Sequence, residues 1–109
     1  MKRVVVRYKV HADRVEEHEA KVRAVFAALA LERPVGLSYQ ALKLGDGVSF
    51  VHVATISTAD GTNPLTELPA FRAFTAGIAD RCEELPTSSP ATAVGAYEDA
   101  RPNGPDTVV

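Results

Sequence analysis

Apolar and polar residues alternate through the first ten positions of the chain. One face would carry Val4, Val6, Tyr8 and Val10, and the other would carry Arg3, Val5, Arg7 and Lys9. A period of two is typical of a half-buried β-strand, so this pattern predicts a strand over Lys2–Val10. Arg7 stands in the middle of the more polar face, where it either meets solvent or contributes to a partner or ligand site.

The spacing of apolar residues then changes to three and four, which predicts a helix that ends near Glu32, before Pro34. Asp13 followed by Glu16 has the form of a capping box at its start. His18 falls on or beside the apolar stripe of this helix. It is either a hydrogen-bonded histidine at the edge of the stripe or a residue that lines a pocket. The stripe consists of Val15, Val22, Val25, Phe26 and Leu29.

Two further strands are predicted over Val35–Leu44 and Val48–Ser57, joined by a Gly-Asp-Gly turn at residues 45–47. Both faces of the second of these strands are mostly apolar. A strand covered on both sides is central in its sheet. His52 lies on one of these faces, so it is expected to be largely buried.

The next segment begins with Asn63-Pro64, which has the form of a helix cap followed by proline at the first helical position. A second apolar stripe then predicts a helix over Leu68–Leu85, with Cys82 as a small buried hydrophobe. The stripe consists of Phe71, Phe74, Ile78, Cys82 and Leu85. Pro86–Pro90 is predicted to be a loop, Ala91–Glu98 a last short strand, and Asp99–Val109 a C-terminal tail.

The predicted order of elements is strand, helix, strand, strand, helix, strand. This is the α+β, ferredoxin-like βαββαβ order, in which an antiparallel sheet carries two helices on one face. We therefore expect one domain over residues 1–98, followed by the tail over residues 99–109. Apolar residues on both sides of the central strand indicate that the open face of the sheet is also covered. A second copy of the sheet is the simplest cover, so a homodimer is expected.

Composition narrows the classes of function. A formal net charge of -2 and a pI of about 5.9 argue against a nucleic-acid partner. No signal-peptide pattern or long apolar segment is found, so no membrane association is expected, and the one cysteine, Cys82, fits a reducing cytoplasm. The histidines His11, His18 and His52 form no closely spaced pair, so no metal site is predicted, and no motif for a cofactor occurs.

Three segments carry a family resemblance: residues 34–39 (PVGLSY), residues 50–55 (FVHVAT) and residues 68–74 (LPAFRAF). They are similar, in order, to a Pro-Gly-x-x-x-Tyr/Phe start of the second strand, a Phe-x-x-x-Glu third strand and a second helix with phenylalanines three apart. With these segments the chain resembles the antibiotic-biosynthesis-monooxygenase-like proteins of the dimeric α+β barrel superfamily, over about Val4 to Glu98. The resemblance implies two sheets that close into a barrel across a dimer, with a pocket between sheet and helices in each subunit.

Members of this superfamily include cofactor-free oxygenases of polyketide quinones, haem-degrading enzymes and isomerases. This chain has Ala54 where many members carry glutamate, and it contains no tryptophan. Two functions are therefore considered. One is a small homodimeric protein that binds a small apolar or aromatic molecule in its pocket. The other is a cofactor-independent monooxygenase or isomerase that acts on an aromatic, polyketide-like substrate.

The candidate site residues follow from the same segments. His52 is the candidate catalytic base, because the ordinary pKa of histidine lies near neutral pH; the alternative is a buried, hydrogen-bonded histidine. Arg7, Tyr39, Asn63 or Arg72 would orient or stabilise an oxygen of the ligand, and His18 would line the pocket. Phe50, Phe71 and Phe74 would form an aromatic wall, or they are simply part of the core.

Overall fold

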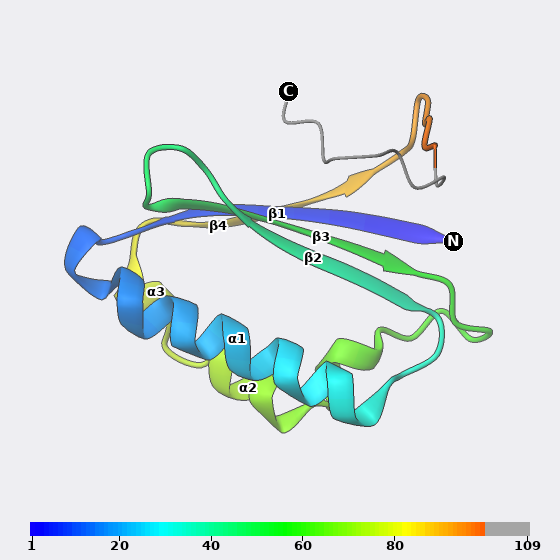
Figure 1. Ribbon diagram of the computed structural model, residues 1–109, viewed down its shortest axis with the longest axis horizontal. Coiled ribbons are helices and arrows are strands. Elements are labelled where there is room, and N and C mark those ends of the chain that lie inside the picture. The colour runs from blue at the N-terminus through cyan, green and yellow to red at the C-terminus, as the bar shows by residue number, and fades with distance from the viewer. Residues whose placement is uncertain (100–109) are drawn as a thin grey trace.

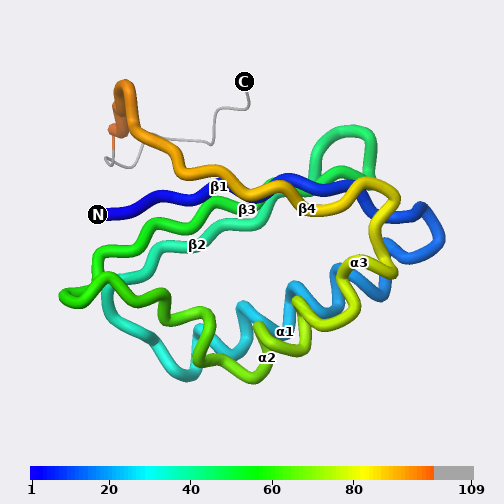
Figure 2. The backbone as a smooth tube through the Cα atoms, turned by 180° about the vertical axis from the view of Figure 1, so that it is seen from behind, coloured from blue at the N-terminus to red at the C-terminus, as the bar shows by residue number. Residues whose placement is uncertain are grey.

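Four antiparallel strands form one sheet in the computed structural model, which describes residues 1–99 (Figure 1). The strands are β1 (Lys2–Val10), β2 (Leu37–Lys43), β3 (Ser49–Ile56) and β4 (Cys82–Ala91), and their order across the sheet is β2-β3-β1-β4. The helices α1 (Val15–Glu32), α2 (Pro69–Thr75) and α3 (Ile78–Arg81) all lie on one face of the sheet, and Figure 2 gives the same picture from behind. The predicted ferredoxin-like α+β fold is therefore confirmed.

The two central strands, β1 and β3, alternate as the sequence predicts. Their register places Val4 opposite Ala54, Val6 opposite His52 and Tyr8 opposite Phe50. These side chains belong to the face covered by the helices, whereas Arg7 on the other face is exposed. The core therefore lies between β1, β3 and the helices. Its buried members include Tyr8, Val10, Val25, Phe50, Ala54, Leu65, Leu68, Phe74 and Cys82.

The turn between β2 and β3 forms where it was predicted. The carboxylate of Asp46 accepts hydrogen bonds from the backbone N–H of Val48 and Ser49 and from the Ser49 hydroxyl. These bonds lower the pKa of Asp46 to about 2. A short aspartate that bonds the backbone two and three residues later stabilises a tight turn, so this hairpin is specified locally.

The start of α1 differs from the prediction. Asp13 lies in a single 3₁₀ turn (Ala12–Arg14) and its side chain does not cap the helix. The side chain of Arg14 instead pairs with Glu17, with N···O distances of 2.9 Å. The end of the helix is as predicted, because Arg33 adopts a left-handed conformation (φ 48°) and its N–H bonds the Leu29 carbonyl, and Pro34 follows.

The predicted second helix, Leu68–Leu85, is wrong in its second half. Helix α2 ends at Thr75, and Gly77 has φ +75°, a conformation that glycine adopts without the steric cost other residues meet. One turn of helix, α3, follows, and the chain then enters β4 at Cys82. The spacing of Cys82 and Leu85 is helical, but pairing with the edge of β1 places both residues in a strand, where Cys82 is buried and Leu85 is exposed.

The predicted loop Pro86–Pro90 and last strand Ala91–Glu98 are also wrong. Strand β4 includes both prolines and ends at Ala91, and residues 92–99 form neither helix nor strand. Proline lacks a backbone donor, so within a sheet it is confined to edge strands and irregular positions. β4 pairs only with β1, and the pairing is irregular between Arg7 and Val10, which explains how a proline-rich segment becomes a strand.

The C-terminal tail predicted over Asp99–Val109 lies, apart from Asp99, outside the described residues. A single domain over residues 1–98 therefore remains a prediction. Within residues 1–99, no helix has the length and apolar character needed to cross a membrane.

Candidate ligand pocket

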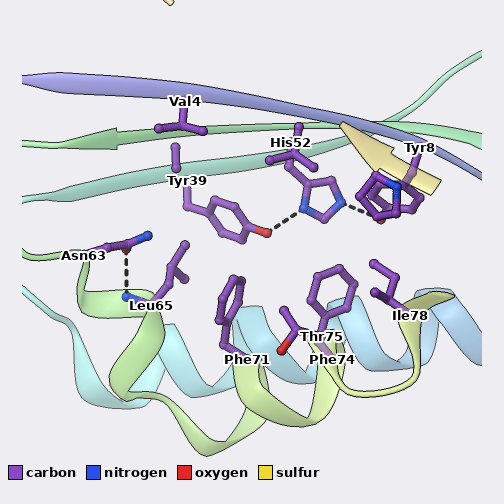
Figure 3. A pocket seen from close by; sticks show the side chains of 13 residues that line it. Val4, Tyr8, Tyr39, His52, Asn63, Leu65, Phe71, Phe74, Thr75 and Ile78 are labelled. Atoms are coloured by element: carbon purple, nitrogen blue, oxygen red, sulfur yellow. Dashed lines mark hydrogen bonds between the residues drawn. The ribbon is translucent and has the colours of Figure 1, made fainter. Parts of the chain in front are cut away.

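A cavity of about 230 Å³ lies between the sheet and α2 (Figure 3). Its walls are mostly apolar, with Leu65, Phe71, Phe74 and Ile78 on the helical side. The side of the sheet contributes Val4, Val6, Tyr8, Tyr39, His52 and Ala54. An apolar cavity with a few polar groups in its wall is the usual form of a small-molecule site, and this volume is somewhat below the usual range of about 300–1,000 Å³.

Tyr39 and His52 come from neighbouring strands. In the register of β2 with β3, Tyr39 lies opposite Ala54, and His52 lies opposite Ala41. Both partners are small, so the two rings lean toward each other across the pair. The Tyr39 hydroxyl lies 2.5 Å from Nδ1 of His52. The Tyr39 ring also stacks on Phe26 of α1, with centroids 5.2 Å apart, which holds the hydroxyl at the cavity.

The hydrogen bonds continue behind the cavity wall. Nε2 of His52 lies 2.7 Å from the hydroxyl of Tyr8, and the same hydroxyl lies 2.5 Å from Nε2 of His18. Nε of Arg81 donates to Nδ1 of His18 at 3.2 Å. Five side chains from β2, β3, β1, α1 and α3 thus form one connected chain, and its members in order are Tyr39, His52, Tyr8, His18 and Arg81.

Burial keeps the middle of this chain uncharged. His18 is 0% exposed and His52 is 4% exposed. Burial lowers the pKa of His18 to about 4, with help from the positive charge of Arg81, and it lowers the pKa of His52 to about 4 as well. Burial raises the pKa of Tyr39 to about 12 and also raises the pKa of Tyr8. Both histidines and both tyrosines are therefore neutral at pH 7.

Asn63 places a second polar group at the cavity. Its side-chain oxygen accepts a hydrogen bond from the N–H of Leu65 at 3.0 Å, which caps the 3₁₀ turn Pro64–Glu67 as predicted. Because the oxygen is held by this bond, the amide nitrogen is the end left for the cavity, and Figure 3 shows it turned away from Leu65. The cavity wall thus holds two donors at separate places, the Asn63 amide and the Tyr39 hydroxyl next to His52 (Figure 3).

The residues named from the sequence separate into three groups. Tyr39, His52, Asn63, Phe71 and Phe74 line the cavity. His18 and Phe50 lie behind Tyr8, where His18 bonds its hydroxyl and Phe50 stacks on its ring at 5.5 Å, so neither lines the cavity. Arg7 is exposed on the opposite face of the sheet and Arg72 is exposed on α2, so neither guanidinium contributes to the pocket.

Two members of the hydrogen-bonded chain were missed by the sequence analysis. Tyr8 shares the inward face of β1 with valines, and a buried hydroxyl on such a face requires a hydrogen-bond partner, so the signal was present. A continuous helix over Leu68–Leu85 would place Arg81 on its solvated side, outside the predicted apolar stripe, but Arg81 is only 2% exposed. The break at Gly77 redirects it, and no local pattern marks that change.

A ring bound in this cavity would pack on Phe71 and Phe74, and an oxygen at its edge would meet either the Tyr39 hydroxyl or the Asn63 amide. His52 has hydrogen bonds at both ring nitrogens, so any action of His52 on a ligand would pass through Tyr39. No group of three or more His, Cys, Asp or Glu side chains in the described part of the chain is arranged to hold a metal ion.

Solved structures with the same fold include antibiotic biosynthesis monooxygenase-like proteins. A candidate antibiotic biosynthesis monooxygenase from Nitrosomonas europaea is 17% identical, with a TM-score of 0.71, and the match covers 87% of this chain and 100% of that one. SnoaB, a cofactor-independent oxygenase from Streptomyces nogalater, is 20% identical, with a TM-score of 0.67, over 90% of this chain and 97% of that one. A further antibiotic biosynthesis monooxygenase is 14% identical, with a TM-score of 0.71, over 87% of this chain and 100% of that one.

No protein-family model matches the chain, and no curated protein sequence does either. The structural neighbours confirm the fold resemblance inferred from residues 34–39, 50–55 and 68–74. The chain therefore has the fold of the antibiotic biosynthesis monooxygenase-like proteins.

Proposed function

We propose that this protein binds a small, mostly apolar or aromatic molecule in the cavity between the sheet and α2. The observation that carries the proposal is an apolar cavity with a few polar groups in its wall, among them the Tyr39 hydroxyl and the Asn63 amide. An apolar cavity of about 150 Å³ accommodates benzene. A cavity of about 230 Å³ therefore suits a ligand of one or two rings.

Binding is tested with the bicyclic ketone 1-tetralone and its parent hydrocarbon tetralin, each followed by NMR titration. We expect 1-tetralone to shift amide signals of β2, β3 and α2. It should bind about tenfold more weakly to Tyr39→Phe than to the wild type, because the variant lacks the buried hydroxyl that donates to the ketone oxygen. Tetralin has no oxygen, so its affinity should be unchanged by this substitution.

Tyr97→Phe is the matched control, because Tyr97 is 90% exposed. This substitution removes the same hydroxyl group at a position that does not line the cavity and should leave both affinities unchanged. If neither compound binds the wild type, or if signals outside the cavity are the ones that shift, the proposal is wrong.

The second candidate is cofactor-independent oxygenation of a phenolic substrate. It is supported by the fold of SnoaB and by the neutral Tyr39–His52 pair at an apolar cavity, which would stabilise a phenolate oxygen while excluding water. With 1-naphthol the balanced reaction would be 1-naphthol plus O₂ giving 1,4-naphthoquinone plus water. One oxygen atom enters the ring and the other leaves as water.

Oxygen uptake and quinone absorbance should then exceed the enzyme-free rate, and His52→Ala should lower the catalysed rate by about 10²-fold or more, the ordinary effect of losing a group that stabilises a developing oxyanion. His11→Ala is the control, since His11 is exposed and outside the cavity. Tight binding of 1-naphthol with no oxygen uptake would leave the binding function and reject this one.

We also propose that the chain is a homodimer joined through the bare face of the sheet. This face carries apolar side chains, and Val5 lies directly opposite Val53 there, next to Val51 and Leu42. Light scattering should give twice the chain mass of 11.6 kDa. Val53→Lys would place a charge in this interface and should shift the protein toward monomer. A wild-type monomer at micromolar concentration would refute the dimer.

A further inference from the structure

Arg81 is a buried cation with no carboxylate in contact with it, although its charge helps lower the pKa of Glu17 at longer range. The residue is 2% exposed, and it forms no ion pair within residues 1–99. Nη2 donates to the Phe74 carbonyl at 2.6 Å, and Nη1 donates to the Ala76 carbonyl at 3.4 Å. These carbonyls end α2, where the helix dipole is negative, so they stabilise the cation and fix its position. Burying a charge costs free energy, so a buried cation without an ion pair is expected to have a specific role.

The third contact of Arg81 determines the position of a proton on His18. Arginine only donates hydrogen bonds and stays protonated, so Nδ1 of His18 must accept from Nε of Arg81. His18 is neutral, so its single ring proton is on Nε2. It donates from there to the hydroxyl of Tyr8.

The same reasoning gives the donor and the acceptor of each remaining hydrogen bond as far as the cavity. The Tyr8 hydroxyl accepts the hydrogen bond from Nε2–H of His18. Its own hydrogen is then donated to the remaining nearby acceptor, Nε2 of His52. His52 is neutral and therefore carries its proton on Nδ1, from which it donates to the Tyr39 hydroxyl. Tyr39 then has its own hydrogen left to donate, and its hydroxyl lies at the cavity (Figure 3).

We propose that Arg81 is a positioning residue that orients this chain of four hydrogen bonds, so that Tyr39 offers a proton to the cavity and the cavity selects ligands with an acceptor oxygen. The amide nitrogen of Asn63 is a second donor, at another place on the cavity wall. Two donors and no charged acceptor favour a carbonyl or a deprotonated phenol or enol over an amine or an alcohol that must donate. Hydrogen bonds in a chain polarise one another, and the cation at the far end strengthens the donor at the near end. The ligand class rests on the proposed binding function, whereas the orientation of the chain does not.

The orientation is tested first, without any ligand. Long-range ¹H–¹⁵N correlation spectra of the histidine rings at pH 7 should show His18 protonated at Nε2 and His52 protonated at Nδ1. Signals are assigned with His18→Gln and His52→Gln. In Arg81→Met the donor to His18 is lost, so both rings should become mixtures of the two tautomers. Arg81→Lys retains a donor and should restore the wild-type pattern.

A proton on Nε2 of His52 in the wild type, or unchanged tautomers in a folded Arg81→Met protein, would overturn the proposal whatever the protein binds. Arg81→Met risks misfolding, because two carbonyls lose their donor. Tyr8→Phe interrupts the chain without touching Arg81 and keeps the ring that stacks on Phe50, so it serves as the second variant. It should likewise leave His52 without a single fixed tautomer.

Ligand selection is tested with the same variants. Arg81→Met and Tyr8→Phe should each weaken the binding of 1-tetralone about threefold to tenfold and leave the affinity for tetralin unchanged. Only the ketone accepts a hydrogen bond from the oriented hydroxyl. Arg72→Met is the matched control, since Arg72 is exposed on α2 and absent from the cavity wall. If the binding of 1-tetralone weakens in Tyr39→Phe but in neither of these variants, the binding function stands and the role of Arg81 is refuted.

Discussion

Acidification from pH 7 to pH 4 should lower the free energy of unfolding by about 3 kcal/mol for each of His18 and His52. Unfolded histidine takes up a proton near pH 6.5, whereas burial lowers the pKa of both residues to about 4 in the folded protein. Between these values the unfolded state binds more protons than the folded state. The stability that the neutral rings contribute is therefore fully present above pH 6.5 and is lost as the pH falls toward 4.

This loss is large beside the total stability of a small domain, which is about 5–15 kcal/mol. Urea unfolding measured at intervals from pH 7 to pH 4 gives the slope, which should approach about 2.7 kcal/mol per pH unit where both histidines titrate, in addition to any contribution from carboxylates. His52→Gln should remove about half of the histidine part of this slope.

His11→Gln is the matched control, because His11 is the one exposed histidine of the three. It should leave the pH dependence as it is in the wild type. If His52→Gln and His11→Gln change the slope equally, the histidines in the hydrogen-bonded chain are not the source of the acid sensitivity.

Phe74→Ala should cost about 3–5 kcal/mol of the free energy of unfolding, as expected for removing a fully packed aromatic ring. Phe74 is 4% exposed and contacts both histidines: its ring stacks on His52 at 5.5 Å and tilts against His18 at 5.4 Å. The guanidinium of Arg81 also lies 5.9 Å from the ring centroid. The substitution thus opens a void under the middle of the hydrogen-bonded chain.

Phe71→Ala provides the comparison for this loss. Phe71 lies three residues earlier on α2, lines the same cavity and is only partly buried, so its removal enlarges a space that already exists. It should cost less than half as much in urea unfolding. Equal losses for the two variants would show that Phe74 has no special place in the core.

Much of the fold could be predicted from the sequence because short-range patterns specify it. The period-two alternation of β1 and β3, the helical spacing of α1, the Asp46 turn and the Asn63 cap all depend on residues within a few positions of one another. The two apolar faces of β3 also predict correctly that it is a central strand and that His52 is buried. Each of these features follows from a local conformational preference or from the burial of one face.

The sequence alone did not predict the hydrogen-bonded chain, because the chain forms only through the tertiary structure. Its contacts join residues that are 10, 44, 13 and 63 positions apart, from five different elements. Strand β4 was likewise decided by pairing with β1, which overrides the helical spacing of Cys82 and Leu85. The turn at Gly77 brings Arg81 back to the end of α2, and this long-range packing converts an arginine expected in solvent into the buried donor that orients the pocket.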